Sequence, residues 1–402
     1  MSISELPSTA TWSDGPNGAD EILARARAAA PSLRARADDI ERTRRLPHDV
    51  VELLRSTGVF RMAVPLDWGG PELNSIDQTK VIEALAIGDA SAAWCAMIGM
   101  DTPIYAGHLE ESVARELFPS PDMITAGLIR PAGRADRVPG GYRVSGRWAF
   151  GSGITHADWV VAGCFVYNGG EFEPSPRGGP RHWRIMLAGP EQFEIMDTWH
   201  TTGLAGSGSQ DYAASDLFVP EEHSFSLAEP RRPGPLFAPD SILRNMPGVP
   251  LGVARAALDM VREIATTRID RTTSRAWAQD YRVQMTIAEA EMELGASREA
   301  VYGSLQRLWD RLESGGELSV DERIGAVLAR VNSFRVARSI VSRLVDLSAT
   351  AAIYRPSPLD RWLRDLNVMR QHVSAQDQVI QSAGAFMLGG VPQEPFNLGI
   401  VP

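Results

Sequence analysis

The chain has 402 residues, of which 44% are hydrophobic and 22% are charged. This length exceeds that of one typical compact domain, so two or three packed units are expected. The net charge of −10 disfavours nucleic-acid binding, because affinity for a phosphate backbone comes mostly from cationic side chains. The chain has no run of about 18 apolar residues and no secretory layout at its start, so we expect a cytoplasmic protein without membrane contact. Cys95 and Cys164 lie far apart and outside any metal-binding spacing, so both are expected to be buried thiols, with no disulfide and no metal site.

The first part of the chain is predicted to be helical. A flexible polar leader is expected over residues 1–18, followed by an N-terminal helical domain over residues 19–123. Helices are expected up to about residue 60, with a new start at Pro47, because proline is favoured in the first turn of a helix. After a turn-rich stretch over residues 67–71, the pattern predicts one apolar helix over residues 76–98.

The middle of the chain, residues 124–228, is predicted to be a β-barrel or β-sandwich domain. Glycine-rich turns such as Gly140-Gly141 separate short segments that are rich in β-branched and aromatic residues. The strands are expected at residues 142–148, 156–166, 184–187 and 213–219, with an exposed loop over residues 168–181.

Residues 240–402 are predicted to form a C-terminal four-helix bundle. Glycine and proline become sparse there, and helical periodicity covers residues 251–267, 277–313, 320–350 and 359–388. The block order of helices, strands and helices gives an α+β fold and argues against a doubly wound nucleotide-binding sheet, in which strands and helices alternate.

Several segments together carry a resemblance to a known family. They are residues 88–94 (GDASAAW), 140–148 (GGYRVSGRW), 203–209 (GLAGSGS) and 217–220 (LFVP). In this order they resemble the acyl-CoA dehydrogenase superfamily. The resemblance implies an acyl-CoA dehydrogenase-like fold, a flavin between the β domain and the C-terminal helices, and a homodimer or homotetramer.

One late segment decides the branch of the family. Residues 366–377 read LNVMRQHVSAQD, where most acyl-CoA dehydrogenases carry a catalytic carboxylate. This segment resembles the two-component flavin-dependent monooxygenases known as group D hydroxylases. The resemblance implies an oxygenase component that takes reduced FMN or FAD from a separate reductase and oxygenates a small aromatic or heterocyclic substrate through a C4a-hydroperoxyflavin.

The same resemblance implies roles for named residues. His372 is expected to manage the proton of the hydroperoxide, and Ser152 is expected to donate a hydrogen bond to flavin N5. The other expected cofactor contacts are Trp148, Phe150, Gly151, Arg275, Trp277, Gln371 and Asp377. The expected substrate-side residues are Asp101, Trp199, Leu204 and Ser207.

Simpler interpretations stay open for some of these residues. His372 could cap a helix, Ser152 could close a turn, and Trp148 and Trp199 could be core aromatics. Phenol hydroxylases of this group usually carry a second histidine in the helix after the Trp94 region, where this chain reads GMDTPIY over residues 99–105. The substrate could instead contain an amine, a ring nitrogen, a sulfur or a ketone.

Two other functions also stay open at this point. The first is an acyl-CoA dehydrogenase or flavin oxidase that uses FAD, with Asp365 or Glu289 as a displaced base. The second is a non-catalytic scaffold subunit of a hetero-oligomer.

Overall fold

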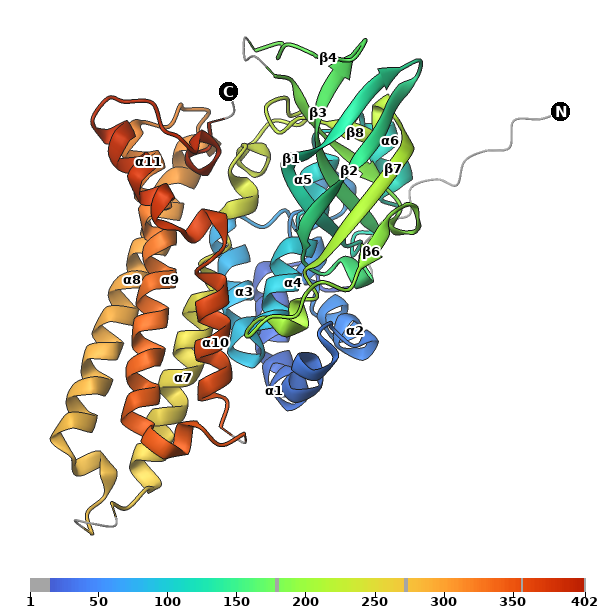
Figure 1. The fold of residues 1–402 in the computed structure, drawn as a ribbon. Helices are drawn as coiled ribbons and strands as arrows, with labels where there is room; N and C mark the ends of the chain where they lie inside the picture. The colour runs from blue at the N-terminus through green and yellow to red at the C-terminus, as the bar shows by residue number, and fades with distance from the viewer. Residues whose placement is uncertain (1–14, 178–180, 271–273, 356, 401–402) are drawn as a thin grey trace.

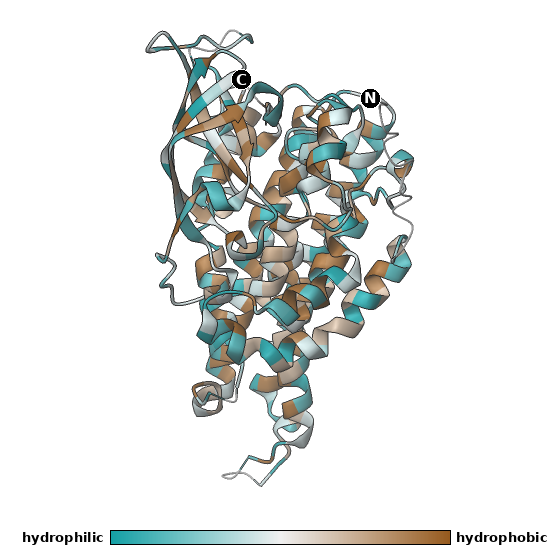
Figure 2. Cartoon of the chain, turned by 90° about the vertical axis from the view of Figure 1, so that its right-hand side faces the viewer, coloured by the Kyte–Doolittle hydropathy of each residue, from teal (hydrophilic) through white to brown (hydrophobic). Residues whose placement is uncertain are grey.

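The computed structural model describes residues 15–177, 181–270, 274–355 and 357–400 (Figure 1). Most of the predicted leader therefore lies outside the described residues. The helices of the first block are α1 (Ala19–Thr43), α2 (His48–Thr57), α3 (Ser75–Gly88), α4 (Ala90–Gly99), α5 (Thr102–Ala106) and α6 (Glu111–Leu117). They share one hydrophobic core with the C-terminal helices, and Figure 2 shows hydrophobic residues along the helices in the middle of the molecule.

The single helix predicted over residues 76–98 is wrong, because the chain breaks between α3 and α4. Asp89 adopts an extended backbone, and its Oδ1 accepts the N–H of Ala92 at 2.8 Å, which caps α4. Just before it, Gly88 lies against α1, where an added Cβ would be 2.6 Å from the carbonyl oxygen of Ala30. The break therefore lets α3 pack closely on α1 while α4 turns toward the sheet.

The middle block is one mixed sheet. Its strands are β1 (Thr125–Val138), β2 (Gly141–Gly151), β3 (Trp159–Asn168), β4 (Glu171–Phe172), β5 (Trp183–Ala188), β6 (Glu194–Met196), β7 (Gln210–Pro220) and β8 (Ser224–Phe225). The order is β6-β7-β2-β1-β3-β5-β8, with β4 paired to β3. β1 and β3 run parallel, whereas the other pairs are antiparallel. The strand expected from residue 156 begins at Trp159, because the 3-10 helix η3 (Ile154–His156) takes the preceding residues.

The inner face of this sheet forms a second core built around Trp148. The Trp148 ring is fully buried, stacks on Tyr212 with 5.5 Å between ring centroids, and donates its N–H to the carbonyl of Gly163 at 2.8 Å. Gly133 makes this position possible, because a Cβ there would be 2.2 Å from the Trp148 ring. Cys164 lies in the same core as a free thiol, and Cys95 is also a free thiol; the predicted burial of both cysteines is confirmed.

The C-terminal block is a bundle of long helices. These are α7 (Gly248–Thr267), α8 (Tyr281–Glu313), α9 (Val320–Ser348), α10 (Leu359–Met369) and α11 (Asp377–Met387). The helix predicted over residues 359–388 is wrong as one element, because a short 3-10 helix, η11 (Val373–Ala375), separates α10 from α11. No described helix is both long enough and apolar enough to cross a membrane.

Candidate functional site

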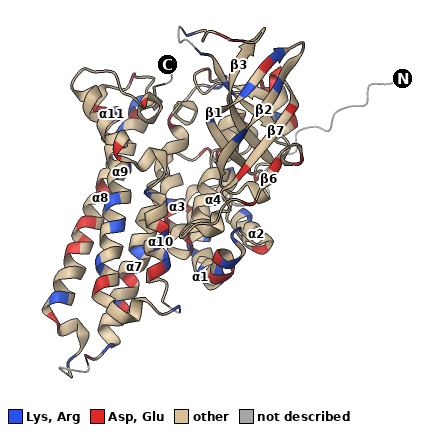
Figure 3. Cartoon of the chain, in the orientation of Figure 1, with Lys and Arg blue, Asp and Glu red and all other residues tan. Residues whose placement is uncertain are grey.

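Four segments that are distant in sequence meet beside α4, which carries no charged residue (Figure 3). Trp94, on α4, is almost fully buried, and its indole N–H donates to Ser152 Oγ at 3.2 Å. Ser152 follows the end of β2. The edge of the Trp94 ring system faces the imidazole of His372, with 5.5 Å between ring centroids and 71° between ring planes. Both residues that the sequence suggested as catalytic therefore contact the same side chain.

Three serine hydroxyls continue from this point, and we call them the serine chain. Ser152 Oγ lies 2.7 Å from Ser209 Oγ, which lies 2.7 Å from Ser207 Oγ. The Ser207 hydroxyl donates to the carbonyl of Leu204 at 2.7 Å. Because Trp94 donates into Ser152 and Ser207 donates outward, Ser209 can donate to either neighbour. If Ser209 donates to Ser152, the Ser152 proton is free for another acceptor.

The loop that carries the serine chain is fixed by Asp365. The N–H of Leu204 donates to Asp365 Oδ1 at 2.6 Å, and the Leu204 carbonyl also accepts the indole N–H of Trp199 at 2.9 Å. Leu204 has a φ of 47°, which is uncommon for a residue with a side chain, so these bonds hold a strained backbone. Burial raises the pKa of Asp365 to about 7, despite the hydrogen bond from Leu204.

His372 is held as a neutral imidazole. Its backbone is extended, and its Nδ1 accepts the N–H of Ser374 at 3.2 Å, which caps η11. Burial, and then the positive charge of Arg330, lower the pKa of His372 to about 4. Because Nδ1 acts as an acceptor, the single proton of the neutral ring lies on Nε2. The capping interpretation and the functional one are thus compatible in this structure.

Phe150 projects from the end of β2 beside the serine chain. It is 64% exposed, its φ is 66°, and its ring is edge-on to that of Trp199 with 6.3 Å between centroids. A tight turn follows, in which the Ser152 N–H donates to the Phe150 carbonyl at 2.8 Å. The next residue, Gly151, is in close contact, because a Cβ there would lie 3.1 Å from the carbonyl oxygen of Gln210. The irregular end of β2 therefore turns an aromatic face outward and a hydroxyl inward.

Other residues suggested by the sequence lie elsewhere. Trp148 is a core residue of the sheet, so its side chain is not available as a flavin contact. Gln371 and Asp377 are exposed, and Asp377 pairs with Arg370 at 2.5 Å. Arg275 and Trp277 belong to the connection between α7 and α8, at the end of the bundle opposite α11 (Figure 1). Within one chain, these two residues do not meet the serine chain.

Trp94 and Ser209 were not predicted from the sequence as site residues. Asp365 was named, but in a different role. Trp94 and Ser209 lie inside the motifs 88–94 and 203–209, but no local pattern shows which of their residues face one another. Asp365 was considered only as a displaced base, and its Oδ1 instead accepts the Leu204 N–H. Glu289 lies on α8, where it pairs with Arg343 at 3.5 Å.

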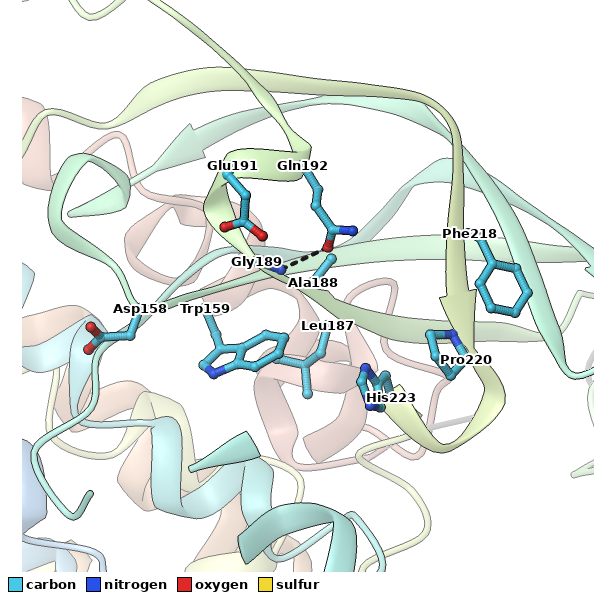
Figure 4. Close-up of a pocket in the computed structure, with 10 residues that line it drawn as sticks. All are labelled: Asp158, Trp159, Leu187, Ala188, Gly189, Glu191, Gln192, Phe218, Pro220 and His223. Carbon is cyan, nitrogen blue, oxygen red and sulfur yellow. Dashed lines mark hydrogen bonds between the residues drawn. The ribbon is translucent and has the colours of Figure 1, made fainter. Parts of the chain in front are cut away.

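A separate hollow of about 470 Å³ lies between strands β5 and β7 of the sheet (Figure 4). The short connection after β5 passes over it, where the Gly189 N–H donates to Gln192 Oε1 at 3.1 Å. The residues around it are Asp158, Trp159, Leu187, Ala188, Gly189, Glu191, Gln192, Phe218, Pro220 and His223. None of them belongs to the serine chain or contacts His372, so this hollow is distinct from the candidate site.

Comparisons with known proteins agree with this architecture. Family models for the N-terminal and C-terminal domains of acyl-CoA dehydrogenase match residues 19–112 and 247–377. The chain is 34% identical to an indole-3-acetate monooxygenase of Pseudomonas putida over 89% of this chain and 91% of that protein. It is 29% identical to the oxygenase component of an FADH2-dependent resorcinol hydroxylase of Rhizobium sp., over 92% of this chain and 95% of that protein. The structure of XiaF from Streptomyces sp. in complex with FADH2 and glycerol shares the fold, with a TM-score of 0.84 and 23% identity over 96% of this chain and 97% of that chain.

Proposed function

This chain belongs to the acyl-CoA dehydrogenase superfamily, in its branch of two-component flavin-dependent monooxygenases, and from that premise we propose that its reaction takes place between Trp94, Ser152 and His372. It is the oxygenase component, which uses reduced FMN or FAD and O2. The fold, the family and the flavin predicted from the sequence are therefore confirmed. The observation that carries the proposed location is the contact of Ser152 and His372 with one side chain, Trp94.

The residues at the end of β2 fit a flavin. An isoalloxazine ring needs flat apolar neighbours and a few polar atoms at its edge. Phe150 offers exposed aromatic surface, Trp199 is half-buried with its ring edge-on to that of Phe150, and Ser152 follows Phe150 by two residues. These three residues would hold the ring. When bound, the reduced flavin supplies the electrons that activate O2.

Ser152 has the position of a hydrogen-bond donor to the cofactor. Its oxygen accepts from Trp94, and it can also accept from Ser209 when that hydroxyl turns toward it. Two donated hydrogen bonds polarise the Ser152 hydroxyl and strengthen it as a donor. The serine chain therefore allows an orientation in which the Ser152 proton points to an acceptor outside the chain.

His372 holds a proton at Nε2 without carrying a charge. A neutral imidazole can donate a hydrogen bond from Nε2 to an oxygen atom without giving up the proton. The ring of Trp94 covers one side of the imidazole and limits the access of water, which would otherwise compete for the same proton. We propose that this hydrogen bond stabilises the negative charge that develops on an oxygen atom during oxygen transfer to the substrate.

The two alternative functions receive no support from particular residues. A dehydrogenase needs an ionised base, whereas Asp365 accepts a backbone N–H in a buried setting and has a raised pKa. Glu289 is paired with Arg343 at 3.5 Å, away from the serine chain. A scaffold subunit would not be expected to keep the contacts of Trp94 with both Ser152 and His372.

The test is oxygen incorporation. The purified chain is mixed with a flavin reductase, NADH, FAD or FMN, and a panel of small aromatic compounds under ¹⁸O2. We expect one ¹⁸O atom in the product of at least one compound. When no such compound is added, we expect the reduced flavin to be oxidised with release of hydrogen peroxide. Product without ¹⁸O, or reduction of the flavin by an acyl-CoA, would contradict the proposal.

For the assembly, we propose a homodimer or homotetramer that forms through the outer face of the bundle. On α8, Met285 and Met292 are 40% and 67% exposed, and Gly295 has open space around it. Exposed apolar side chains close together on one helix are a feature of interaction sites. Met292→Glu should lower the molar mass measured by light scattering, whereas Leu66→Glu, at an exposed residue of the N-terminal block, should not. Unchanged mass for Met292→Glu would contradict this interface.

A further inference from the structure

The carboxyl group of Asp101 is buried without a complete set of partners. The residue is 3% exposed, and its Oδ1 forms no hydrogen bond with any described residue. Burial alone raises its pKa well above the ordinary carboxyl value, with no cation acting against that rise. Buried polar atoms in folded proteins are nearly always hydrogen-bonded, so an unpaired oxygen requires an explanation.

Asp101 directly follows α4 and precedes α5. Backbone bonds from Met100 to Ala96 at 3.0 Å and from Asp101 to Ile98 at 3.2 Å continue the helical course of α4. Asp101 is seven residues, or about two helical turns, beyond Trp94, so helix geometry places the two side chains on one side, about 10 Å apart along the axis. Trp94 contacts both Ser152 and His372, so this spacing directs Asp101 toward the side of α4 that carries the candidate site.

The surroundings of Asp101 contain a second unpaired polar atom and, among the described residues, no partner for its Oδ1. Asn245 donates its side-chain N–H to the sulfur of Met100 at 3.0 Å, while its own Oδ1 is unpaired. His108, by contrast, interacts with the backbone of Ile104 and of Leu227. Two buried oxygen atoms near the junction of α4 and α5 therefore have no hydrogen-bond partner within the described part of the chain.

From these observations we infer that Asp101 determines substrate specificity, by accepting a hydrogen bond at Oδ1 from a ring N–H of a neutral aromatic substrate. This inference rests on the proposed function, and it narrows the substrate class to N–H heteroaromatics such as indoles. An anionic group at this end of the substrate is disfavoured, because Asp101 has no cation beside it, among the described residues, that could offset a buried negative charge. A site that pairs with an N–H discriminates strongly against an analogue that lacks it, because the buried acceptor is then left unsatisfied.

The test compares indole with benzofuran, which has nearly the same shape but an oxygen in place of the N–H. Calorimetric titration of the flavin-free protein gives the dissociation constant of each compound. We expect indole to bind roughly 10- to 100-fold more tightly than benzofuran. In Asp101→Leu this ratio should fall to about one, whereas Asp101→Asn, which keeps an acceptor oxygen, should retain most of it.

A matched control is Thr102→Val, at the residue that follows Asp101. This change removes the buried hydrogen bond between the hydroxyls of Thr102 and Thr125 and should leave the ratio of the two dissociation constants unchanged. Thermal melts check that each variant is folded. Equal affinity for indole and benzofuran, no binding of indole at millimolar concentration, or an unchanged ratio in Asp101→Leu would overturn the inference. Because this titration needs neither flavin nor O2, its failure is distinguishable from a failure of oxygen incorporation.

Discussion

The buried carboxyl of Asp365 should make the stability of this protein depend on pH. Its pKa of about 7 in the folded state compares with an ordinary value of 3.8. The folded protein therefore binds more protons than the unfolded chain between these two values, and the free energy of unfolding falls as pH rises through this window. From pH 5 to pH 8 the loss amounts to about 2.5 kcal/mol.

Asp365→Asn isolates this effect, because the amide is neutral at every pH and its oxygen can still accept the Leu204 N–H. Urea unfolding of the wild type and the variant at pH 5, 6, 7 and 8 gives the difference in free energy of unfolding. We expect this difference to shift by about 2.5 kcal/mol in favour of the variant between pH 5 and pH 8. Asp365→Ala lacks the acceptor and should be about 1–3 kcal/mol less stable than Asp365→Asn at every pH. A difference between wild type and Asp365→Asn that does not change with pH would refute the assignment of a protonated buried acid.

Three further variants test the site and the sheet. His372→Ala should divert flavin oxidation from product to hydrogen peroxide while changing the flavin dissociation constant by less than about threefold, as loss of a hydrogen-bond donor to the reacting oxygen requires; unchanged coupling would contradict that role. Trp94→Phe keeps an aromatic ring but removes the N–H bonded to Ser152, so it should lower stability by about 1 kcal/mol in urea unfolding and also lower coupling. Gly133→Ala places a Cβ against Trp148 and should cost about 1–3 kcal/mol of stability, whereas an unshifted melting temperature would count against the packing described for the sheet.

The block order was predictable from the sequence because each block has its own periodicity. Helical repeats dominate both ends, and short β-branched segments with glycine turns dominate the middle, so the classes of element follow from composition and spacing. The breaks inside these blocks were harder to find. The one at Asp89 has a local signal, a glycine followed by a capping residue, whereas the one at His372 has neither glycine nor proline nearby.

The site was predictable only in part, because its contacts join residues far apart in the chain. Ser152 and His372 were found through a family motif, but Trp94, which contacts both, has the composition of an ordinary core residue. Trp148 shows the opposite error, since its place in a motif suggested a cofactor contact while Gly133 opens a slot for it in the sheet core. A motif indicates that a segment matters, whereas the direction of each side chain depends on register and bulges that only the fold provides.

The break between α10 and α11 connects the least predictable feature of the chain to its chemistry. If the helix continued through residue 372, the N–H of Ser374 would be directed along the helix axis toward residue 370, and it could not donate to the His372 ring. The extended backbone at His372 instead lets Nδ1 accept that N–H at 3.2 Å, which fixes the tautomer and leaves the proton on Nε2. The helical hydrogen bonds are therefore interrupted at a residue whose proton position matters for the proposed reaction. Departures from local preference are expected at functional sites, and here the departure sets which nitrogen carries the proton.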